Sequence, residues 1–424
     1  MEFPNTIVIS SSFFSDKSNN GKTLSSFFFE YPIDKLSQLA FSVSPNNPSV
    51  CKRYYALTIT DVLKRKRGKE YQAFSEIDYS SETKKNSWIK SVFHYFSEKR
   101  LPVTILLKNC IWSFYDRKGI YEFIESVKPD VVFFQGFSLS YGYKVALDIC
   151  ERYSLPMILE LTDDYTARLY PKSFIDYLNH KKYDRYFEKA IRYSSSVIVI
   201  SPKMKQEYER RYGKSMIEMM NSVSLNNSTD NLRDEHLFVY AGNVRLNRWK
   251  VLVELGKAIH RIDPKNVLLI CTPDAVSDNV LDTFTKCPSI KYGGSLNSTE
   301  LQGVFSKCNY VVHVEAFDKA NKEITRYSIS TKIPEYMSSG AIMIAIGPDD
   351  IASMEYISNE KIGICINSIT CDDIYNKLNG VLNDSRLLCQ IKGRAQEVCY
   401  RNHSINKNAM IIRQLLTDAI HKVK

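Results

Sequence analysis

Three basic residues stand close together where an apolar run gives way to a predicted helix: Arg245, Arg248 and Lys250. A glycine, Gly242, ends the apolar run and is followed by Asn243. Cations at a helix N-terminus meet the partial positive charge of the helix, so this cluster is unfavourable unless an anion lies among them. Because guanidinium groups form paired bonds to phosphate, the cluster predicts a pyrophosphate site. Three solvated cations are the alternative interpretation.

A second candidate is the segment STKIPEYMSSG, which begins with Ser330 and includes Thr331 and Lys332. Its proline suits the first turn of a helix, and Gly340 suits the end of a short one. Glu335 falls in that first turn, where its carboxylate could accept hydrogen bonds from two hydroxyl groups, as a ribose would supply. Stabilisation of the helix dipole explains Glu335 equally well.

A third candidate is the group Asn20, Gly21 and Lys22, which follows the first predicted strand and a polar loop. A glycine at this position lets backbone N–H groups approach a phosphate, and the start of a helix adds partial positive charge. The P-loop pattern GxxxxGKS/T is absent, because only its last three letters are present. A turn glycine is the alternative interpretation.

The adjacent carboxylates Asp163 and Asp164 follow another predicted strand. Such a pair could bind a divalent ion, act as a general base or cap a helix. Two neighbouring side chains on an extended chain point apart. We therefore expect one functional carboxylate and one cap in preference to a metal pair.

The elements that must position these residues follow a simple pattern. Short apolar runs alternate with longer amphipathic stretches, which predicts an α/β fold with parallel sheets covered by helices on both faces. Parallel sheets bind ligands at the carboxyl ends of their strands. The predicted strands are 6–10, 103–107, 131–134, 157–161, 197–200, 237–240, 267–271, 310–314 and 341–346, and the predicted helices include 141–153, 187–193, 249–262 and 408–423.

The strand–helix pattern pauses once, in a polar stretch rich in Asn and Ser, and then restarts. This predicts two Rossmann-like domains, 1–220 and 235–400, joined by a linker at 221–234 and followed by a final amphipathic helix in 401–424. A ligand cleft is expected between the two domains.

Composition sets further limits. The chain has 424 residues, of which 44% are hydrophobic and 25% charged, which excludes a disordered or collagen-like chain. No apolar run approaches the roughly 20 residues of a membrane-spanning helix, and the first residues lack the basic start of a secretory signal. None of the ten cysteines forms a CxxC pair. We therefore expect a cytoplasmic protein with reduced thiols and no structural metal.

The charge is uneven along the chain. Residues 1–220 carry 33 Lys and Arg against 25 Asp and Glu, within a total net charge of +10. The densest basic run, at 64–69, could meet nucleic acid, anionic lipid or a phosphorylated substrate. A solvated loop is the alternative interpretation of that run.

These segments together resemble a known enzyme family over nearly the whole chain. The most specific are AGNVRLNRWKVLVELGKAI and STKIPEYMSSGAIMIAIGP, and the supporting ones are NNGKTLSSFF, CKRYYALTITD, KPDVVFFQG and TDDY. They are similar to GT-B-fold, retaining glycosyltransferases of glycosyltransferase family 4 type. In bacteria, such transferases build capsule, the O-antigen of lipopolysaccharide and exopolysaccharide.

The resemblance implies roles for individual residues. Arg248 grips the donor pyrophosphate, assisted by Arg245 or Lys250, and Glu335 holds the ribose as the second glutamate of the family's Glu–seven residues–Glu motif. The remaining donor contacts are assigned to Gly21, Gly242, Asn243, Thr331 and Lys332, acceptor contacts to Asn20, Lys22 and Gln135, and catalytic roles to Asp163, Asp164 and Glu315.

The sequence departs from the family pattern at two positions. The first motif glutamate would fall at position 327, which is Tyr327. Glu315, at the end of a predicted strand, is the expected substitute, and Glu323 is its rival. A histidine that is frequent in the family after a strand of the N-terminal domain is replaced by Gln135.

The expected reaction is transfer of a hexosyl group from a UDP-, GDP- or dTDP-linked sugar to a hydroxyl of a lipid-linked saccharide, without a metal or other cofactor. Peripheral contact with the inner face of the plasma membrane is expected, and nucleic acid is not an expected partner. A nucleotide-sugar epimerase of similar fold and a non-enzymatic nucleic-acid-binding protein are the two alternatives, and acceptor-free product or salt-sensitive RNA binding would reveal them.

Overall fold

The computed structural model describes residues 3–15, 19–43, 45, 50–73, 102–166, 173–224 and 233–422. The chain divides into two compact units. Unit 1 comprises Met1–Val199, Lys205–Glu218 and Ala409–Lys424, and unit 2 comprises Ile200–Met204 and Met219–Asn408. Unit 1 therefore includes the end of the chain. Residues 225–232 of the predicted linker lie outside the described residues.

Unit 1 is built on one sheet whose described strands follow the order β4-β3-β2-β1-β5-β6-β7-β8. All neighbouring strands are parallel except β4, which is antiparallel to β3. The strands are β1 (Thr6–Ser10), β2 (Leu36–Ala40), β3 (Arg53–Ala56), β4 (Lys69–Gln72), β5 (Val131–Gln135), β6 (Met157–Leu161), β7 (Ser196–Val199) and β8 (Ile217–Glu218).

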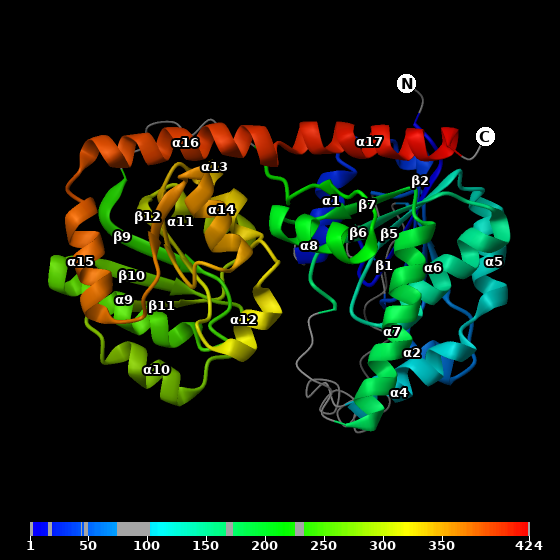
Figure 1. The fold of residues 1–424 in the computed structure, drawn as a ribbon, viewed down its shortest axis with the longest axis horizontal. Coiled ribbons are helices and arrows are strands. Elements are labelled where there is room, and N and C mark those ends of the chain that lie inside the picture. Colours follow the sequence, from blue (N-terminus) through cyan, green and yellow to red (C-terminus); the bar gives the residue numbers. More distant parts are fainter. Residues whose placement is uncertain are drawn as a thin grey trace. The chain divides into compact units, whose positions relative to one another are not determined.

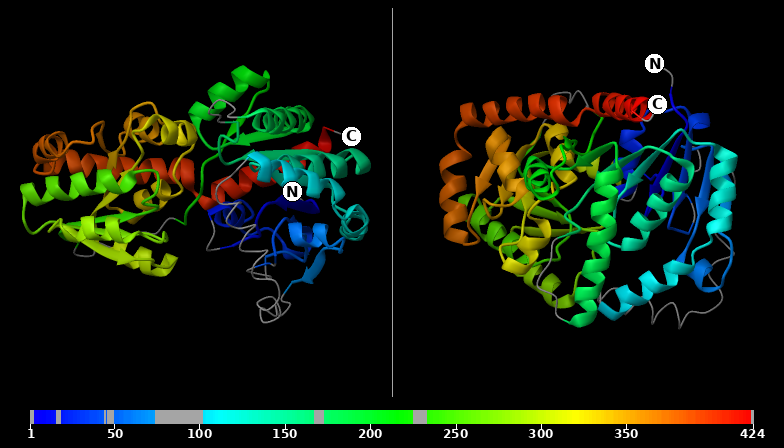
Figure 2. Two further views of the ribbon diagram at one scale, coloured as in Figure 1. Left: turned by 90° about the horizontal axis from the view of Figure 1, so that it is seen from below. Right: turned by 45° about the vertical axis from the view of Figure 1, so that its right-hand side comes forward.

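Helices flank this sheet (Figures 1 and 2). They are α1 (Asn19–Phe27), α2 (Ile59–Leu63), α4 (Pro102–Ile111), α5 (Arg117–Val127), α6 (Ser140–Tyr153), α7 (Phe174–Tyr193) and α8 (Pro202–Tyr212), with short 3₁₀ helices η1 (Ile33–Lys35) and η3 (Trp112–Phe114) and the last helix, α17 (Ile405–His421).

Unit 2 is built on a second sheet, whose described strands follow the order β11-β10-β9-β12-β13-β14 and are all parallel. Numbered within the unit, this is the 3-2-1-4-5-6 order of a Rossmann sheet, with the reversal between β9 and β12. The strands are β9 (Asp234–Ala241), β10 (Val267–Cys271), β11 (Ile290–Gly294), β12 (Cys308–Val314), β13 (Ile342–Ile346) and β14 (Gly363–Ile366).

The helices of unit 2 cover both faces of this sheet (Figure 1). Neighbouring residues of β12 enter opposite cores: Val311 packs with α13 and α16 on one face, and Val312 packs with α9 and α15 on the other. The helices are α9 (Arg248–Ile262), α10 (Asp278–Thr285), α11 (Ser298–Phe305), α12 (Lys319–Thr325), α13 (Lys332–Ser339), α14 (Ala352–Glu360), α15 (Cys371–Val381) and α16 (Ser385–His403).

The α/β class and the two parallel sheets are confirmed, but one predicted strand is wrong. Residues 103–107 lie inside helix α4, which begins at Pro102. A short apolar run with β-branched residues is compatible with either a strand or a helix, and the proline at the first helical position decides between them. No helix among the described residues combines the length and the apolar character that a membrane crossing requires.

Candidate functional site

The reversal of strand order in unit 2 brings two chain segments together at one edge of the sheet. Strand β9 ends at Ala241 and is followed by Gly242, while the neighbouring strand β12 ends at Val314 and is followed by Glu315. Open parallel sheets bind ligands at this kind of position, beyond the carboxyl ends of the strands. A side chain at position 242 would meet the hydroxyl of Tyr240 at 3.0 Å, so glycine keeps this turn compact.

The loop between β9 and α9 is held by contacts to its backbone. The Tyr240 hydroxyl donates to the carbonyl of Asn243 (2.6 Å), and the carboxylate of Asp274 accepts from the N–H of Val244 (2.9 Å). The last two loop residues, Leu246 and Asn247, both adopt the left-handed backbone conformation, with φ of 57° and 61°. Such a conformation is unfavourable for leucine, so the surrounding contacts must impose this path on the chain.

The central contact of the site is an ion pair between Arg248 and Glu315. Arg248 Nη2 lies 2.7 Å from Glu315 Oε2, and the two side chains are only 16% and 3% exposed. Burial alone would raise the pKa of Glu315, but the charge of Arg248 and the neighbouring His313 lower it below its usual value. Glu315 is therefore an anion at neutral pH.

The guanidinium of Arg248 retains hydrogen-bonding capacity. Its Nε is buried and has no hydrogen-bond partner among the described residues. An arginine offers five N–H donors in a planar fork, and Glu315 accepts from one of the nitrogens of Arg248. The arrangement can therefore bind an anion while Glu315 keeps the guanidinium in place.

The other two basic residues of the predicted cluster are arranged differently. Arg245 Nε lies 3.0 Å from the buried carboxylate of Asp274, and Lys250 lies over the ring of Trp249 at 5.7 Å from its centroid. Protein carboxylates thus offset the charges of Arg245 and Arg248. The repulsion inferred from the sequence does not by itself require an external anion, because Asp274 and Glu315 are already present.

Helix α13 begins at the same edge of the sheet, because it follows β12 along the chain. The hydroxyl of Tyr336 donates to the carbonyl of Ala241 (3.2 Å) and accepts from its N–H (3.3 Å), which fixes the helix to the end of β9. Glu335, in the first turn, is bonded to Lys332 (2.8 Å). Thr331 precedes the helix without capping it, and the helix ends at Gly340 as predicted.

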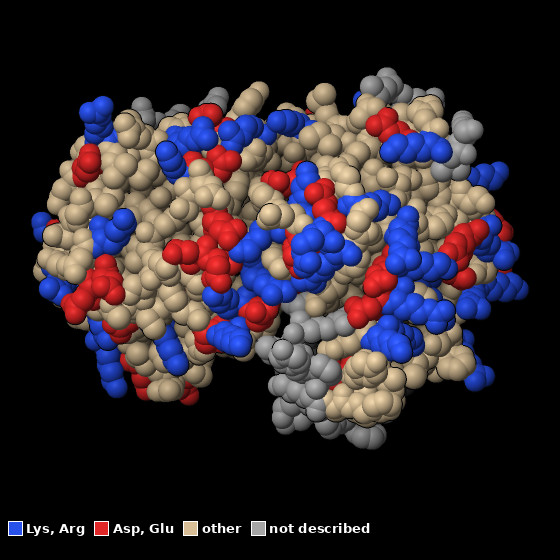
Figure 3. All heavy atoms as spheres, viewed as in Figure 1, with Lys and Arg blue, Asp and Glu red and all other residues tan. Residues whose placement is uncertain are grey.

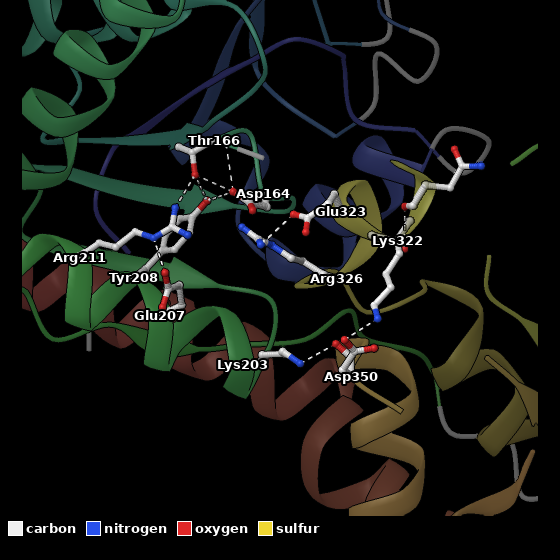
Figure 4. Close-up of polar contacts among 12 residues, drawn as sticks. Asp164, Thr166, Lys203, Glu207, Tyr208, Arg211, Lys322, Glu323, Arg326 and Asp350 are labelled. Atoms are coloured by element: carbon white, nitrogen blue, oxygen red, sulfur yellow. Dashed lines mark hydrogen bonds and ion pairs between the residues drawn. The ribbon is translucent and has the colours of Figure 1, made fainter. Parts of the chain in front are cut away.

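The two candidates for the missing motif glutamate lie in different surroundings. Glu315 follows β12 and contacts Arg248, as described above. Glu323 lies in α12 and forms an ion pair with Arg326 (2.8 Å; Figure 4). Beside it, Lys322 is paired with Asp350 (2.6 Å). Of these two glutamates, Glu315 contacts a residue of the predicted donor site, whereas the ion-pair partner of Glu323 is Arg326.

In unit 1, Gln135 ends β5, and its side-chain amide donates to Glu160 at the end of β6 (2.9 Å). Burial raises the pKa of Glu160 to about 8, although the bond from Gln135 opposes the shift. The side chain of Gln135 is therefore hydrogen-bonded to a buried acid that is largely protonated at neutral pH. Asn20, Gly21 and Lys22 lie inside the first turn of α1, not in a loop before it, because the helix already begins at Asn19.

The two adjacent carboxylates differ in burial. Asp164 is buried and accepts from the hydroxyl of Tyr208 (2.6 Å) and from the N–H and hydroxyl of Thr166 (3.1 and 2.7 Å; Figure 4). These bonds hold the turn after β6. Asp163 is exposed. Asp164 is thus the structural member of the pair.

Sequence reasoning missed four residues that shape these sites: Asp274, His313, Tyr336 and Glu160. A signal existed for two of them. His313 stands two positions before Glu315 and so shares its face of the chain, and Glu160 is a lone acid within an apolar strand. Asp274 and Tyr336 carry no local signal, because their importance depends on contacts with distant segments. Among the described residues, no group of three or more His, Cys, Asp or Glu could hold a metal ion.

No protein-family model matches the sequence, and no curated protein matches it either. Solved structures do match the fold. HepE of Anabaena, in complex with UDP and glucose, aligns with a TM-score of 0.60 and 13% identity over 97% of this chain and 99% of its own. Sucrose-phosphate synthase of Thermosynechococcus elongatus aligns with a TM-score of 0.64 and 11% identity over 99% and 100%.

A mutant of TarM from S. aureus, in complex with fondaparinux, alpha-GlcNAc-glycerol and UDP, aligns with a TM-score of 0.61 and 11% identity over 98% of this chain and 99% of its own. At such low identity these alignments establish the fold alone. The chain therefore has the GT-B fold, with two α/β units that each contain a parallel sheet flanked by helices.

Proposed function

We propose that the chain is a glycosyltransferase that moves a hexosyl group from a nucleoside diphosphate sugar to a hydroxyl of a lipid-linked saccharide, with retention of configuration, in the synthesis of bacterial surface polysaccharide. The observation that carries the proposal is the Arg248–Glu315 pair beyond the carboxyl ends of β9 and β12. The structures of HepE with UDP-glucose and of TarM with UDP support a nucleotide-sugar donor.

The chemical task is charge stabilisation. When the bond between the sugar and the diphosphate breaks, the leaving group gains negative charge and the sugar becomes positively charged. Arg248, held by Glu315, and the N-terminus of α13 would receive the leaving diphosphate in place of a metal ion, and Arg245 or Lys250 would assist. Glu335 would hold the ribose hydroxyls, with Thr331, Lys332, Gly242 and Asn243 as further donor contacts.

The acceptor belongs to unit 1 in this proposal. Asp163 would orient the acceptor hydroxyl, while Asp164 holds the turn that carries it. Asn20, Gly21, Lys22 and Gln135 would contribute the surrounding contacts. The acceptor hydroxyl would attack from the face that the diphosphate leaves, so that the new C–O bond replaces the bond to the diphosphate and the hydroxyl proton passes to the departing phosphate oxygen. Since the acceptor is lipid-linked, the protein would work at the inner face of the plasma membrane.

A ligand screen tests the proposal directly. Thermal unfolding of the purified protein is measured with UDP-, GDP- and dTDP-sugars, because a ligand that binds the folded state raises the melting temperature. One class of donor should stabilise the wild type and should lose that effect in Arg248→Ala. A protein that none of the donors stabilises, or an Arg248→Ala variant that transfers sugar at the wild-type rate, would contradict the proposal.

A further inference from the structure

Unit 1 contains a pocket that none of the predicted site residues lines. It lies between α4, η3, α6 and α7, which pack against one another (Figure 1). One wall is a stacked pair of rings, Trp112 and Tyr141, whose centroids are 4.2 Å apart. The lining residues are Asn109, Trp112, Ser113, Ser140, Tyr141, Lys144, Lys182 and Tyr186.

Two lysines at this pocket have no direct ion-pair partner among the described residues. Lys144 and Lys182 are both partly buried, and neither has a hydrogen-bond or ion-pair partner among the described residues. Burial lowers the pKa of Lys144, and the nearby charges of Arg117 and Lys182 lower it further, against a smaller opposing effect of Asp148. The carboxylate of Asp148 itself accepts hydrogen bonds from the hydroxyls of Tyr115 and Tyr121, the latter at 2.7 Å. An anion between the two lysines would relieve this imbalance.

The pocket also lies at the start of a helix. Ser140 and Tyr141 are the first residues of α6, and Leu139 before them makes no side-chain capping bond. The 14-residue helix follows β5, so the pocket is on the side of the sheet where the strands end at their carboxyl termini. The partial positive charge of this helix end adds to that of the two lysines.

Exposed apolar side chains are frequent on three of the elements that form the pocket. Six of the fifteen large exposed hydrophobic side chains in the described residues belong to α4, η3 and α7. On α4 the usual pattern is reversed, because Val103 and Leu107 are about half exposed while Thr104 and Asn109 are buried. The six are Val103, Leu107, Phe114, Phe174, Tyr177 and Leu178.

A space-filling view shows which charged side chains lie around these exposed apolar residues. Figure 3 shows uncharged side chains over the end of unit 1 where α4 and the start of α7 lie, with both basic and acidic side chains around them. Apolar and aromatic groups next to unpaired cations are complementary to the two parts of a phospholipid-like molecule, an apolar chain and an anionic head. A soluble phosphorylated ligand would not need the six exposed apolar side chains.

We propose that this surface binds a phosphate-bearing lipid in a membrane, with the phosphate between Lys144 and Lys182 and the apolar chains against the six exposed hydrophobic side chains. The inference rests on the proposed function and deepens it, because it assigns a site to a phospholipid of the bilayer that carries the acceptor. It uses none of the residues proposed to bind the donor.

Protection of lysines from acetylation tests the site in the wild-type protein. The protein is acetylated under mild conditions with vesicles of phosphatidylcholine alone, with vesicles that also contain phosphatidic acid, or with inorganic phosphate, and each lysine is quantified by mass spectrometry. We expect phosphatidic acid vesicles to slow acetylation of Lys144 and Lys182 severalfold and to leave Lys181, which is exposed on the same helix, much less affected.

Variants provide a second, independent readout. The affinity for phosphatidic acid vesicles, measured by co-sedimentation, should fall about thirtyfold in the double variant Lys144→Gln/Lys182→Gln, as expected for two cations at an anionic surface, and should be unchanged in the matched control Lys181→Gln. Phe114→Ser/Phe174→Ser should also weaken it. Equal sedimentation of the double variant and wild type, protection by inorganic phosphate alone, or loss of the apolar surface in a dimer would overturn the proposal.

The donor screen separates this inference from the proposed function. Stabilisation of the wild type by a nucleotide sugar depends on unit 2, and lipid binding depends on unit 1. A protein that binds the donor but not the lipid contradicts only the present inference, and one that binds the lipid but no donor contradicts only the proposed transfer reaction.

Discussion

The guanidinium of Arg248 lies 2.7 Å from the carboxylate of Glu315, and this contact joins the first residue of α9 to the residue that follows β12. The two segments come from neighbouring strands at the reversal of the sheet, although they are far apart in the sequence. A buried ion pair is weak evidence of net stabilisation, because both charges lose their hydration. Loss of only one partner, however, is strongly destabilising, because the other charge then remains buried and unpaired.

The first prediction concerns that requirement. Arg248→Met leaves the anion of Glu315 buried without its partner, so we expect the free energy of unfolding to fall by about 3 kcal/mol. Urea denaturation measures the change. The second substitution in Arg248→Met/Glu315→Leu should recover most of the loss, because no buried charge then remains. A double variant as unstable as the sum of both single variants would show that the two side chains do not interact.

The second prediction concerns pH and Glu160. Its carboxyl group has a pKa of about 8 in the folded protein, where burial is the main cause, against an ordinary value of 4.5. Between these values the folded state holds a proton that the unfolded chain has released. Stability therefore decreases as pH rises through this range, by up to about 1.4 kcal/mol per pH unit.

The variant Glu160→Gln tests this pH dependence, because an amide of the same shape does not titrate. Unfolding free energies of wild type and variant are measured by urea denaturation between about pH 5 and 8. The variant should gain stability relative to wild type as pH rises. Parallel curves over the whole range would mean that Glu160 is not the buried acid described here.

Several core strands could be predicted from the sequence because they are buried on both faces and form apolar runs, but the buried strand β2, whose sequence LSQLA contains two polar residues, was not predicted. The predicted bounds of β1, β6 and β10 agree with the structure. The strand predicted at 103–107 is wrong because these residues belong to helix α4. This helix exposes apolar residues such as Val103 and Leu107, so apolar content alone did not indicate which face of the segment is buried. The edge strand β4 was missed because its residues are polar and mostly exposed.

The candidate site was predictable only in part. The glycine turn and the charges at the start of α9 can be read locally, because they lie within ten residues of one another. The partners of those charges cannot be read locally. Asp274 and Glu315 follow two other strands, β10 and β12, and only the strand order brings them close to the arginines. Pairing of Arg245 and Arg248 with these carboxylates is therefore a result of the fold, which no local pattern contains.

The third prediction separates the two adjacent carboxylates. Asp164→Asn removes the charge that accepts bonds from Tyr208 and Thr166, so unfolding free energy should fall by about 2 kcal/mol. Asp163→Asn changes an exposed side chain and should alter stability by no more than about 0.5 kcal/mol. If Asp163 orients the acceptor, its substitution should still lower kcat roughly 10²-fold. Unchanged kcat in Asp163→Asn would remove it from the mechanism.

The last prediction concerns Glu335 and the ribose of the donor. A carboxylate that accepts two hydroxyl bonds should lose at least one charge-assisted bond in Glu335→Gln, so the dissociation constant of the nucleotide should rise about tenfold. Titration calorimetry with the nucleotide chosen by the donor screen measures the change. Glu323→Gln is the matched control, since Glu323 is a partly exposed glutamate that forms an ion pair with Arg326.

A deoxynucleotide makes this test specific for the hydroxyl groups. If Glu335 binds the ribose, the 2′,3′-dideoxy form of the same nucleotide, which lacks both hydroxyls, should bind wild type more weakly and should lose little further affinity in Glu335→Gln, because both hydroxyl bonds are already absent. A merely structural effect, such as release of Lys332 from its bond to Glu335, would weaken both nucleotides equally. The coupling between removal of the ribose hydroxyls and the substitution Glu335→Gln, and not the size of either effect alone, therefore decides whether Glu335 contacts the ribose.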